Sequence, residues 1–201
     1  MAISIDTATN CRLIDAGALV TEKLLGQPVK TLLAIMGPAS GHGFSARPLS
    51  QYQLSRLLWA SQACGAGSAG VSVYVAAIDG LYRFDPDAFF LEHVVRGDVS
   101  AVLAGAGLAT GAPLSMLYVA DLGGLRAPDP GQGTLAAAIR AGCCSQNVTL
   151  MCAAEGLATT VQVVNDGGAL AGAMKLRHTQ RLVLAQAVGW PAAIGDAQAA
   201  T

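Results

Sequence analysis

The stretch that decides the fold is AGCCSQNVTLMCAAEGLATT, from Ala141 to Thr160. Small and apolar residues occupy nearly every helical position before Glu155, which predicts a helix that is packed on all sides. Gly156 can adopt a positive φ, the conformation at which helices commonly end. The β-branched residues of Thr159 to Val164 then predict a strand. The sequence therefore predicts a buried helix, starting near Thr134, that passes through a corner at Gly156 into a sheet.

The composition of the chain limits the classes of protein to which it can belong. The chain has 201 residues, of which 53% are hydrophobic and only 12% are charged, so it can supply a large core. We expect one domain over residues 1–201. No apolar run approaches the roughly 18 uninterrupted residues of a membrane-spanning helix. Because so few charged residues are available to cover the surface, we also expect the chain to associate with itself.

Charge and cysteine content limit which partners the protein can bind and in which compartment it is expected. The formal net charge is −1 and no stripe of Lys and Arg is present, which excludes a nucleic-acid partner. The N-terminus lacks the basic and apolar regions of a secretory signal. The five cysteines show neither C-x-x-C nor Cys/His spacing, which favours reduced thiols, a cytoplasmic protein and no metal site.

Helices and strands are mixed along the chain, and turn signals separate them. Asp79-Gly80 between two β-rich runs predicts an antiparallel hairpin. The pattern indicates an α+β sandwich, in which a sheet is covered by helices. The predicted helices are Thr9 to Gly26, 51–64 after a cap at Ser50, a helix after Asp98, the helix from Thr134, and a short one from Asp166 to near Leu176. The predicted strands are 71–77, 81–85, 113–121, 159–164 and 181–191.

Residues 65–70, GAGSAG, match the G-x-G-x-x-G spacing of a dinucleotide site, and Asp85 follows at a suitable distance. That motif requires a strand before the glycines and a helix after them, so that helical N–H groups point at the pyrophosphate. Here a helix precedes the glycines and a strand follows. We therefore interpret residues 65–70 as a loop, and the Rossmann hypothesis fails if they do not join a strand to a helix.

The polar and thiol side chains of the helix before Gly156 are interpreted as structural and not as catalytic or metal-binding groups. Cys143, Cys144 and Cys152 lie in an apolar helix and are expected to pack in the core. Asn147 is expected to anchor neighbouring backbone or a second subunit. Glu155 lies near the C-terminus of the helix, where the macrodipole disfavours a negative charge, so it is expected to have a cationic or N–H partner.

Five segments, in this order, resemble the nitroreductase family of flavin-dependent oxidoreductases. They are LSQYQLSRLLWASQACG with the later Ser68-Ala69 pair, VYVAAIDGLYRFDPDAFFLEHVVRGD, APLSMLYVAD, AGCCSQNVTLMCAAEGLATTV and LVLAQAVGWP. The resemblance implies a mostly antiparallel sheet flanked by helices in an intertwined homodimer. It also implies FMN at the dimer interface and hydride transfer from NAD(P)H to a nitro, quinone or other unsaturated acceptor. Since the cofactor carries the chemistry, no catalytic side chain is identified.

The family's Arg-Arg-Ser-x-Arg-x-Phe motif, which holds the FMN phosphate, corresponds here to residues 38–44, PASGHGF. Ser40 and Phe44 persist, His42 replaces the last arginine, and the other arginines are absent. Arg47 lies close by in sequence and is a further candidate. We therefore assign Ser40, His42 and Arg47 to cofactor binding, as the resemblance implies.

The remaining candidates come from two further segments. Ser68 belongs to a loop that is shorter than in the family. Gln162, Val163 and Val164 belong to the segment that lies over the flavin ring, where the backbone N–H groups of the two valines would serve N5 and O4. Nothing after Arg181 is cationic, so the family's basic residues beyond the last strand are absent.

Two functions remain open at this point. One is an FMN-dependent NAD(P)H oxidoreductase. The alternative is a homologue that has lost tight FMN binding and acts as a non-catalytic dimer that binds a small molecule or a protein. Losing two or three charge-assisted contacts of about 1.5–3 kcal/mol each would lower FMN affinity by several orders of magnitude.

Overall fold

A computed structural model describes residues 11–12, 43–62, 70–108, 111–124, 130–164 and 168–192. Within these residues, seven strands form one sheet in the order β1-β4-β3-β2-β5-β7-β6, and every neighbouring pair is antiparallel. The predicted α+β sandwich is confirmed. The strands are β1 (Cys11–Arg12), β2 (Val71–Ala77), β3 (Gly80–Asp85), β4 (Phe90–Arg96), β5 (Leu114–Asp121), β6 (Ala158–Val163) and β7 (Gln180–Gly189).

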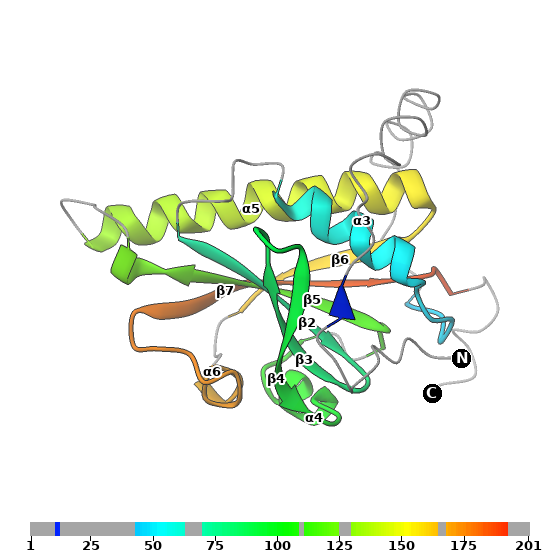
Figure 1. The fold of residues 1–201 in the computed structure, drawn as a ribbon, viewed down its shortest axis with the longest axis horizontal. Helices are drawn as coiled ribbons and strands as arrows, with labels where there is room; N and C mark the ends of the chain where they lie inside the picture. The colour runs from blue at the N-terminus through cyan, green and yellow to red at the C-terminus, as the bar shows by residue number, and fades with distance from the viewer. Residues whose placement is uncertain are drawn as a thin grey trace.

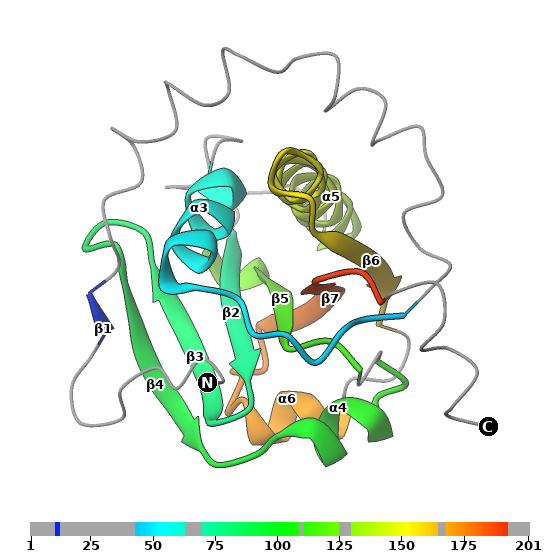
Figure 2. The ribbon, with the colours of Figure 1, turned by 90° about the vertical axis from the view of Figure 1, so that its right-hand side faces the viewer.

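Helices cover both faces of the sheet, which gives three layers (Figures 1 and 2). The described helices are α3 (Gln51–Gln62), α4 (Ser100–Gly105), the short 3-10 helix η1 (Leu122–Gly124), α5 (Pro130–Glu155) and α6 (Gly168–Ala173). Helices α3 and α5 lie on one face, whereas α4 and α6 lie on the other. Successive side chains of a strand point to opposite faces. In β2, Val73 and Val75 accordingly belong to the core under α3 and α5, and Tyr74 and Ala76 to the core over α4 and α6.

Helix α3 begins with a capping box. The Ser50 hydroxyl accepts a hydrogen bond from the Gln53 N–H at 3.2 Å, and the Gln53 side-chain oxygen accepts one from the Ser50 N–H at 2.8 Å. This reciprocal pair satisfies two N–H groups at the helix start. The predicted cap at Ser50 and the predicted hairpin are both confirmed, the hairpin by the pairing of Ala77 with Gly80.

Helix α5 ends as its sequence predicts. Gly156 has a φ of +72°. The Leu157 N–H donates to the Cys152 carbonyl at 2.8 Å and the Gly156 N–H donates to the Ala153 carbonyl at 3.3 Å. These two bonds form a Schellman motif, which closes the helix and redirects the chain. The corner at Gly156 therefore delivers the chain to β6 two residues later.

Three expectations about α5 are corrected. The helix begins at Pro130, four residues before Thr134, because proline fits the first helical position, where no N–H is needed. It is not packed on all sides, since Leu135 is 62% exposed and Ile139 is 59% exposed. Of the three cysteines, Cys144 and Cys152 are buried, as expected, but Cys143 is exposed. One side of α5 is therefore uncovered in the single chain.

Other differences are local. Cys11–Arg12 forms strand β1 against β4, so the helix predicted from Thr9 to Gly26 is wrong at these two residues. Strand β4 was not predicted, because Glu92 and His93 separate its apolar residues into two short pairs. Helix α6 ends at Ala173, three residues before Leu176. The rest of the first predicted helix and the Asp166 cap lie outside the described residues.

Candidate functional site

Strand β6 lies at one edge of the sheet and pairs only with β7 among the described strands. Its outer edge therefore offers backbone N–H and C=O groups to a ligand. Val161 is 45% exposed and Val163 is 69% exposed. Within a strand, the N–H groups of neighbouring residues point in opposite directions. Because β6 ends at Val163, this rule does not apply to Val164, and its N–H group can point to the same side as that of Val163. Gln162 is half-buried beside them.

A buried polar network lies between α5 and the β6 end of the sheet. Gln186 of β7 is fully buried. Its side-chain oxygen accepts a hydrogen bond from the Tyr118 hydroxyl at 2.7 Å. Its nitrogen donates to the Ser145 carbonyl at 3.2 Å, the Thr149 hydroxyl at 3.1 Å and the Thr159 hydroxyl at 3.0 Å. Burial raises the pKa of Tyr118 well above its usual value, so the phenol stays protonated and donates.

This network joins side chains of β5, β6 and β7 to one another and to the backbone of α5, and it therefore holds β6 against its neighbours. Polar groups in such a place are costly unless every one is paired. Gln186 was not predicted as important. A single polar residue within the apolar run of residues 182–189 is the signal that could have identified it.

Arg47 lies against Trp190 at the far end of β7. The guanidinium carbon is 3.7 Å from the centroid of the indole ring. The indole nitrogen donates to the Pro48 carbonyl at 3.3 Å. Phe44 and Pro191 form an antiparallel bridge, which fastens the segment carrying Arg47 to the end of β7. Arg47 itself is exposed.

The two regions lie at opposite ends of the same strand. Gly189, directly before Trp190, pairs with Ala158, whereas Val163 pairs with Leu184. Five residues of strand span about 17 Å. The structure therefore places Arg47 and Val163 on one border of the sheet but does not bring them into contact. Ser40, His42 and Ser68 lie outside the described residues.

A buried ion pair joins α3 to α5. Arg56 is 1% exposed and Glu155 is 12% exposed, and the guanidinium donates directly to the carboxylate. The expectation that Glu155 has a cationic partner is confirmed. Arg56 was missed from the sequence, because its place on α3 between leucines indicates core packing and not a charge. The pair holds the last turn of α5, immediately before Gly156.

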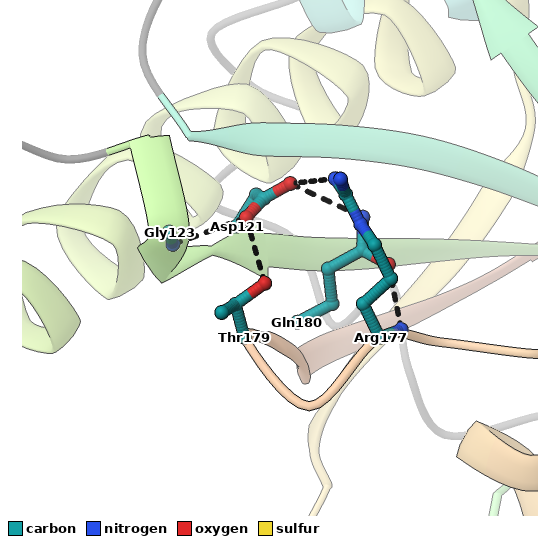
Figure 3. A network of polar contacts seen from close by, with 5 residues as sticks. All are labelled: Asp121, Gly123, Arg177, Thr179 and Gln180. Carbon is teal, nitrogen blue, oxygen red and sulfur yellow. Dashed lines mark hydrogen bonds and ion pairs between the residues drawn. The ribbon is translucent and has the colours of Figure 1, made fainter.

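The start of β7 is held by a polar cluster around Asp121 (Figure 3). One carboxylate oxygen accepts from the Gly123 N–H at 3.1 Å and the Thr179 hydroxyl at 3.3 Å. The other accepts from the Gln180 side chain at 3.3 Å and from Arg177. The cluster joins the end of β5 to the turn before β7. These contacts therefore anchor the start of β7.

The loop predicted at residues 65–70 joins α3 to β2. A helix therefore precedes the glycines and a strand follows them, and the Rossmann hypothesis is excluded. No helix in the described part of the chain is long and apolar enough to cross a membrane. The described residues also contain no group of three His, Cys, Asp or Glu side chains suited to hold a metal ion.

The sequence profile described as Nitroreductase family matches residues 40–190. The chain belongs to the nitroreductase family. The match covers β6, the Arg47 segment and Trp190, and so includes the whole border of the sheet described above. No curated protein matches the chain at a significant level.

Solved structures agree with membership of the nitroreductase family. A protein assigned as a nitroreductase from Ralstonia eutropha JMP134 is 29% identical, with a TM-score of 0.68 over 81% of this chain and 83% of that one. Nitroreductase A from Vibrio parahaemolyticus is 18% identical, with a TM-score of 0.60 over 82% and 69%. A chain of the microcin synthetase McbBCD complex from E. coli is 17% identical, with a TM-score of 0.66 over 77% and 69%. The last two likenesses concern the fold alone. Membership of the family indicates an oxidoreductase, and members of this family typically use flavin and nicotinamide cofactors.

Proposed function

We propose that this nitroreductase-family protein is an FMN-dependent oxidoreductase. It takes hydride from NAD(P)H and delivers it to a nitro compound, a quinone or another small unsaturated acceptor. The observation that carries the proposal is the outer edge of β6, which pairs with no other described strand. Val163 lies there, within the segment corresponding to the family's flavin-facing residues, and is 69% exposed. An exposed valine at a strand edge suits a flat, partly apolar ring that also accepts hydrogen bonds.

The groups at this border fit the two ends of FMN. The flavin ring needs apolar contact and N–H donors, and the end of β6 offers Val161, Val163 and the backbone of Val164. The phosphate needs a cation, and Arg47 offers an exposed guanidinium. The two groups lie toward opposite ends of β6, as the ring and the phosphate lie at opposite ends of FMN.

When bound, FMN supplies the hydride acceptor and donor of the reaction. The chain's own residues would bind and orient the flavin, and they would exclude water from its ring. Backbone N–H groups of Val163, the last residue of β6, and of Val164, directly after it, would hold the N5 and O4 edge of the flavin as hydrogen-bond donors. The valine side chains exclude water from the ring. No titratable side chain of β6 is required.

We further propose that the active form is a homodimer. Five large hydrophobic side chains are strongly exposed among the described residues, and four of them belong to α5 and β6: Leu135, Ile139, Val161 and Val163. The fifth, Ile78, belongs to the β2–β3 hairpin. Apolar side chains gathered on two neighbouring elements are typical of an association surface. A second copy that covers α5 would also enclose the flavin edge of β6.

Sedimentation velocity tests the dimer. Ile139→Lys is expected to produce monomer, because it places a charge within an apolar interface. Ile78→Lys, a change of the same chemistry at a similarly exposed position, is expected to leave the dimer intact. A wild-type protein that sediments as a monomer at micromolar concentration would contradict the proposal.

Flavin absorption and NAD(P)H oxidation test the cofactor. The purified protein incubated with excess FMN is expected to retain visible flavin bands after gel filtration and to oxidise NAD(P)H in the presence of a quinone. Val163→Asp is expected to weaken FMN binding, because the carboxylate repels electron density at the ring edge, whereas Ile78→Asp is not. A colourless protein with no FMN-dependent rise in melting temperature would contradict FMN dependence.

A second function is favoured by one observation. Residues 38–44 carry no arginine and no cation follows Arg181, so the chain has fewer phosphate contacts than the family's motif implies. On this alternative the protein is a non-catalytic dimer that uses the same border to bind another small molecule or a protein. A dimer that binds no flavin and oxidises no NAD(P)H would favour it.

A further inference from the structure

We infer that Trp190 is a positioning residue that holds Arg47 as a phosphate anchor, and so makes the site prefer a phosphorylated flavin. This inference rests on the proposed function. It goes beyond it by naming the residue that sets the choice between FMN and riboflavin, which has the same ring but no phosphate.

Arg47 has no carboxylate partner among the described residues. Among the described residues, the guanidinium groups of Arg56, Arg83 and Arg177 are paired with carboxylates, and Arg47 is not. Its guanidinium lies 3.7 Å from the centre of the Trp190 ring. An arginine stacked on an aromatic ring keeps its in-plane N–H donors available, and these suit a phosphate in bidentate geometry. Arg47 is therefore fixed in place without being neutralised.

Trp190 is itself anchored to the rest of the chain. The ring is partly buried against the core under α3 and α5. Its nitrogen donates to the Pro48 carbonyl at 3.3 Å, and its carbonyl accepts from the Ser45 N–H at 2.8 Å. Trp190 is thus held at both its side chain and its backbone. A rigid ring gives Arg47 a fixed platform.

The contact with Trp190 lowers the entropic cost that Arg47 incurs when it binds a ligand. A free arginine side chain loses rotamer freedom when it binds a ligand, which weakens the interaction. An arginine already held by a ring loses less. Since residues 38–44 carry no arginine and no cation follows Arg181, a single preorganised guanidinium carries more of the phosphate affinity than it would in a site with several. Trp190 is expected to act only through Arg47, and only on ligands with a phosphate.

The experiment measures the dissociation constants of FMN and riboflavin for the full chain by quenching of flavin fluorescence. The wild type is expected to bind FMN at least tenfold more tightly than riboflavin, the effect of one charge-assisted contact. Arg47→Gln is expected to remove most of that preference. Trp190→Leu is expected to lower it about two- to fivefold, the effect of an exposed cation–π contact, and Trp190→Phe less, because it keeps an aromatic face.

Two controls separate positioning from general damage. The double variant Arg47→Gln/Trp190→Leu is expected to show the same preference as Arg47→Gln, because Trp190 has nothing left to position. Arg96→Gln removes an exposed arginine of β4, which three strands separate from β7, and is expected to leave both constants unchanged. Since the measurement is a ratio, a variant that merely loosens the fold weakens both flavins equally.

Each outcome has one meaning. Equal weakening of FMN and riboflavin by Trp190→Leu would overturn the inference, as would a double variant with a smaller preference than Arg47→Gln. A wild type that binds both flavins equally would overturn the phosphate anchor and leave the proposed function standing. A wild type that binds neither flavin would contradict the proposed function itself, and the inference with it.

Discussion

The ion pair between Arg56 and Glu155 gives the sharpest stability prediction. Glu155→Ala leaves a guanidinium that is 1% exposed with no carboxylate, and removing one partner of a buried pair typically costs about 3–5 kcal/mol. Because Glu155 is 12% exposed, water partly reaches the gap, and the lower end of that range, about 3 kcal/mol, is expected. For a chain of this size this corresponds to a fall in melting temperature of about 6–12 °C.

The assay is urea denaturation at one fixed protein concentration, because a dimer's stability depends on concentration. Glu92→Ala is the matched control. It breaks the Arg83–Glu92 pair, whose side chains are 49% and 47% exposed, and such surface pairs contribute about 0–1 kcal/mol. The double variant Arg56→Met/Glu155→Leu is expected to recover most of the loss, since it removes both charges and keeps apolar volume. If Glu155→Ala destabilises the protein no more than Glu92→Ala does, the argument from burial is wrong.

Three further predictions concern single positions. Gly156→Ala is expected to cost about 1 kcal/mol, since φ is +72° and no atom lies within 4 Å of the added Cβ, so thermal unfolding measures the backbone cost alone. Gln186→Leu leaves the Tyr118 hydroxyl buried without its acceptor and is expected to cost about 2 kcal/mol or more, measured by urea denaturation; a loss below 0.5 kcal/mol, roughly the smallest for one hydrogen bond, would mean that the network is not stabilising. Burial raises the pKa of Cys152 to about 12 from 9.0, so its contribution to stability is full below pH 9 and is lost as the pH rises toward 12. Cys152→Ala should flatten this alkaline decline in the free energy of unfolding, and a thiol reagent should label the buried Cys152 far more slowly in the folded protein than after unfolding in urea.

Local signals in the sequence predicted much of the fold. The capping pattern at Ser50, the Asp79-Gly80 turn and the glycine at 156 each act within a few residues, and each is confirmed. Strands β2 and β5 were recognised because both of their faces are buried, which requires continuous apolar runs. Such signals do not depend on which elements later become neighbours.

What the sequence could not provide was the outcome of long-range pairing. Strand β4 was missed because it is stabilised by pairing with β3 and not by its own pattern. The exposed side of α5 was missed because an apolar helix has the same sequence whether its last face meets its own chain or another. The contact of Arg47 with Trp190 joins residues that are far apart in sequence, and no local pattern predicts it.

The position of β7 has a consequence for how the protein is made. The last described strand lies between β5 and β6, and β6 has no other neighbour among the described strands. Synthesis proceeds from the N-terminus, so β5 and β6 leave the ribosome before the strand that joins them. Until β7 arrives, both present unpaired backbone, which is a hazard for aggregation. Completion of the sheet, and with it the flavin-facing border, is therefore expected to be a late event that follows the emergence of residues 180–189.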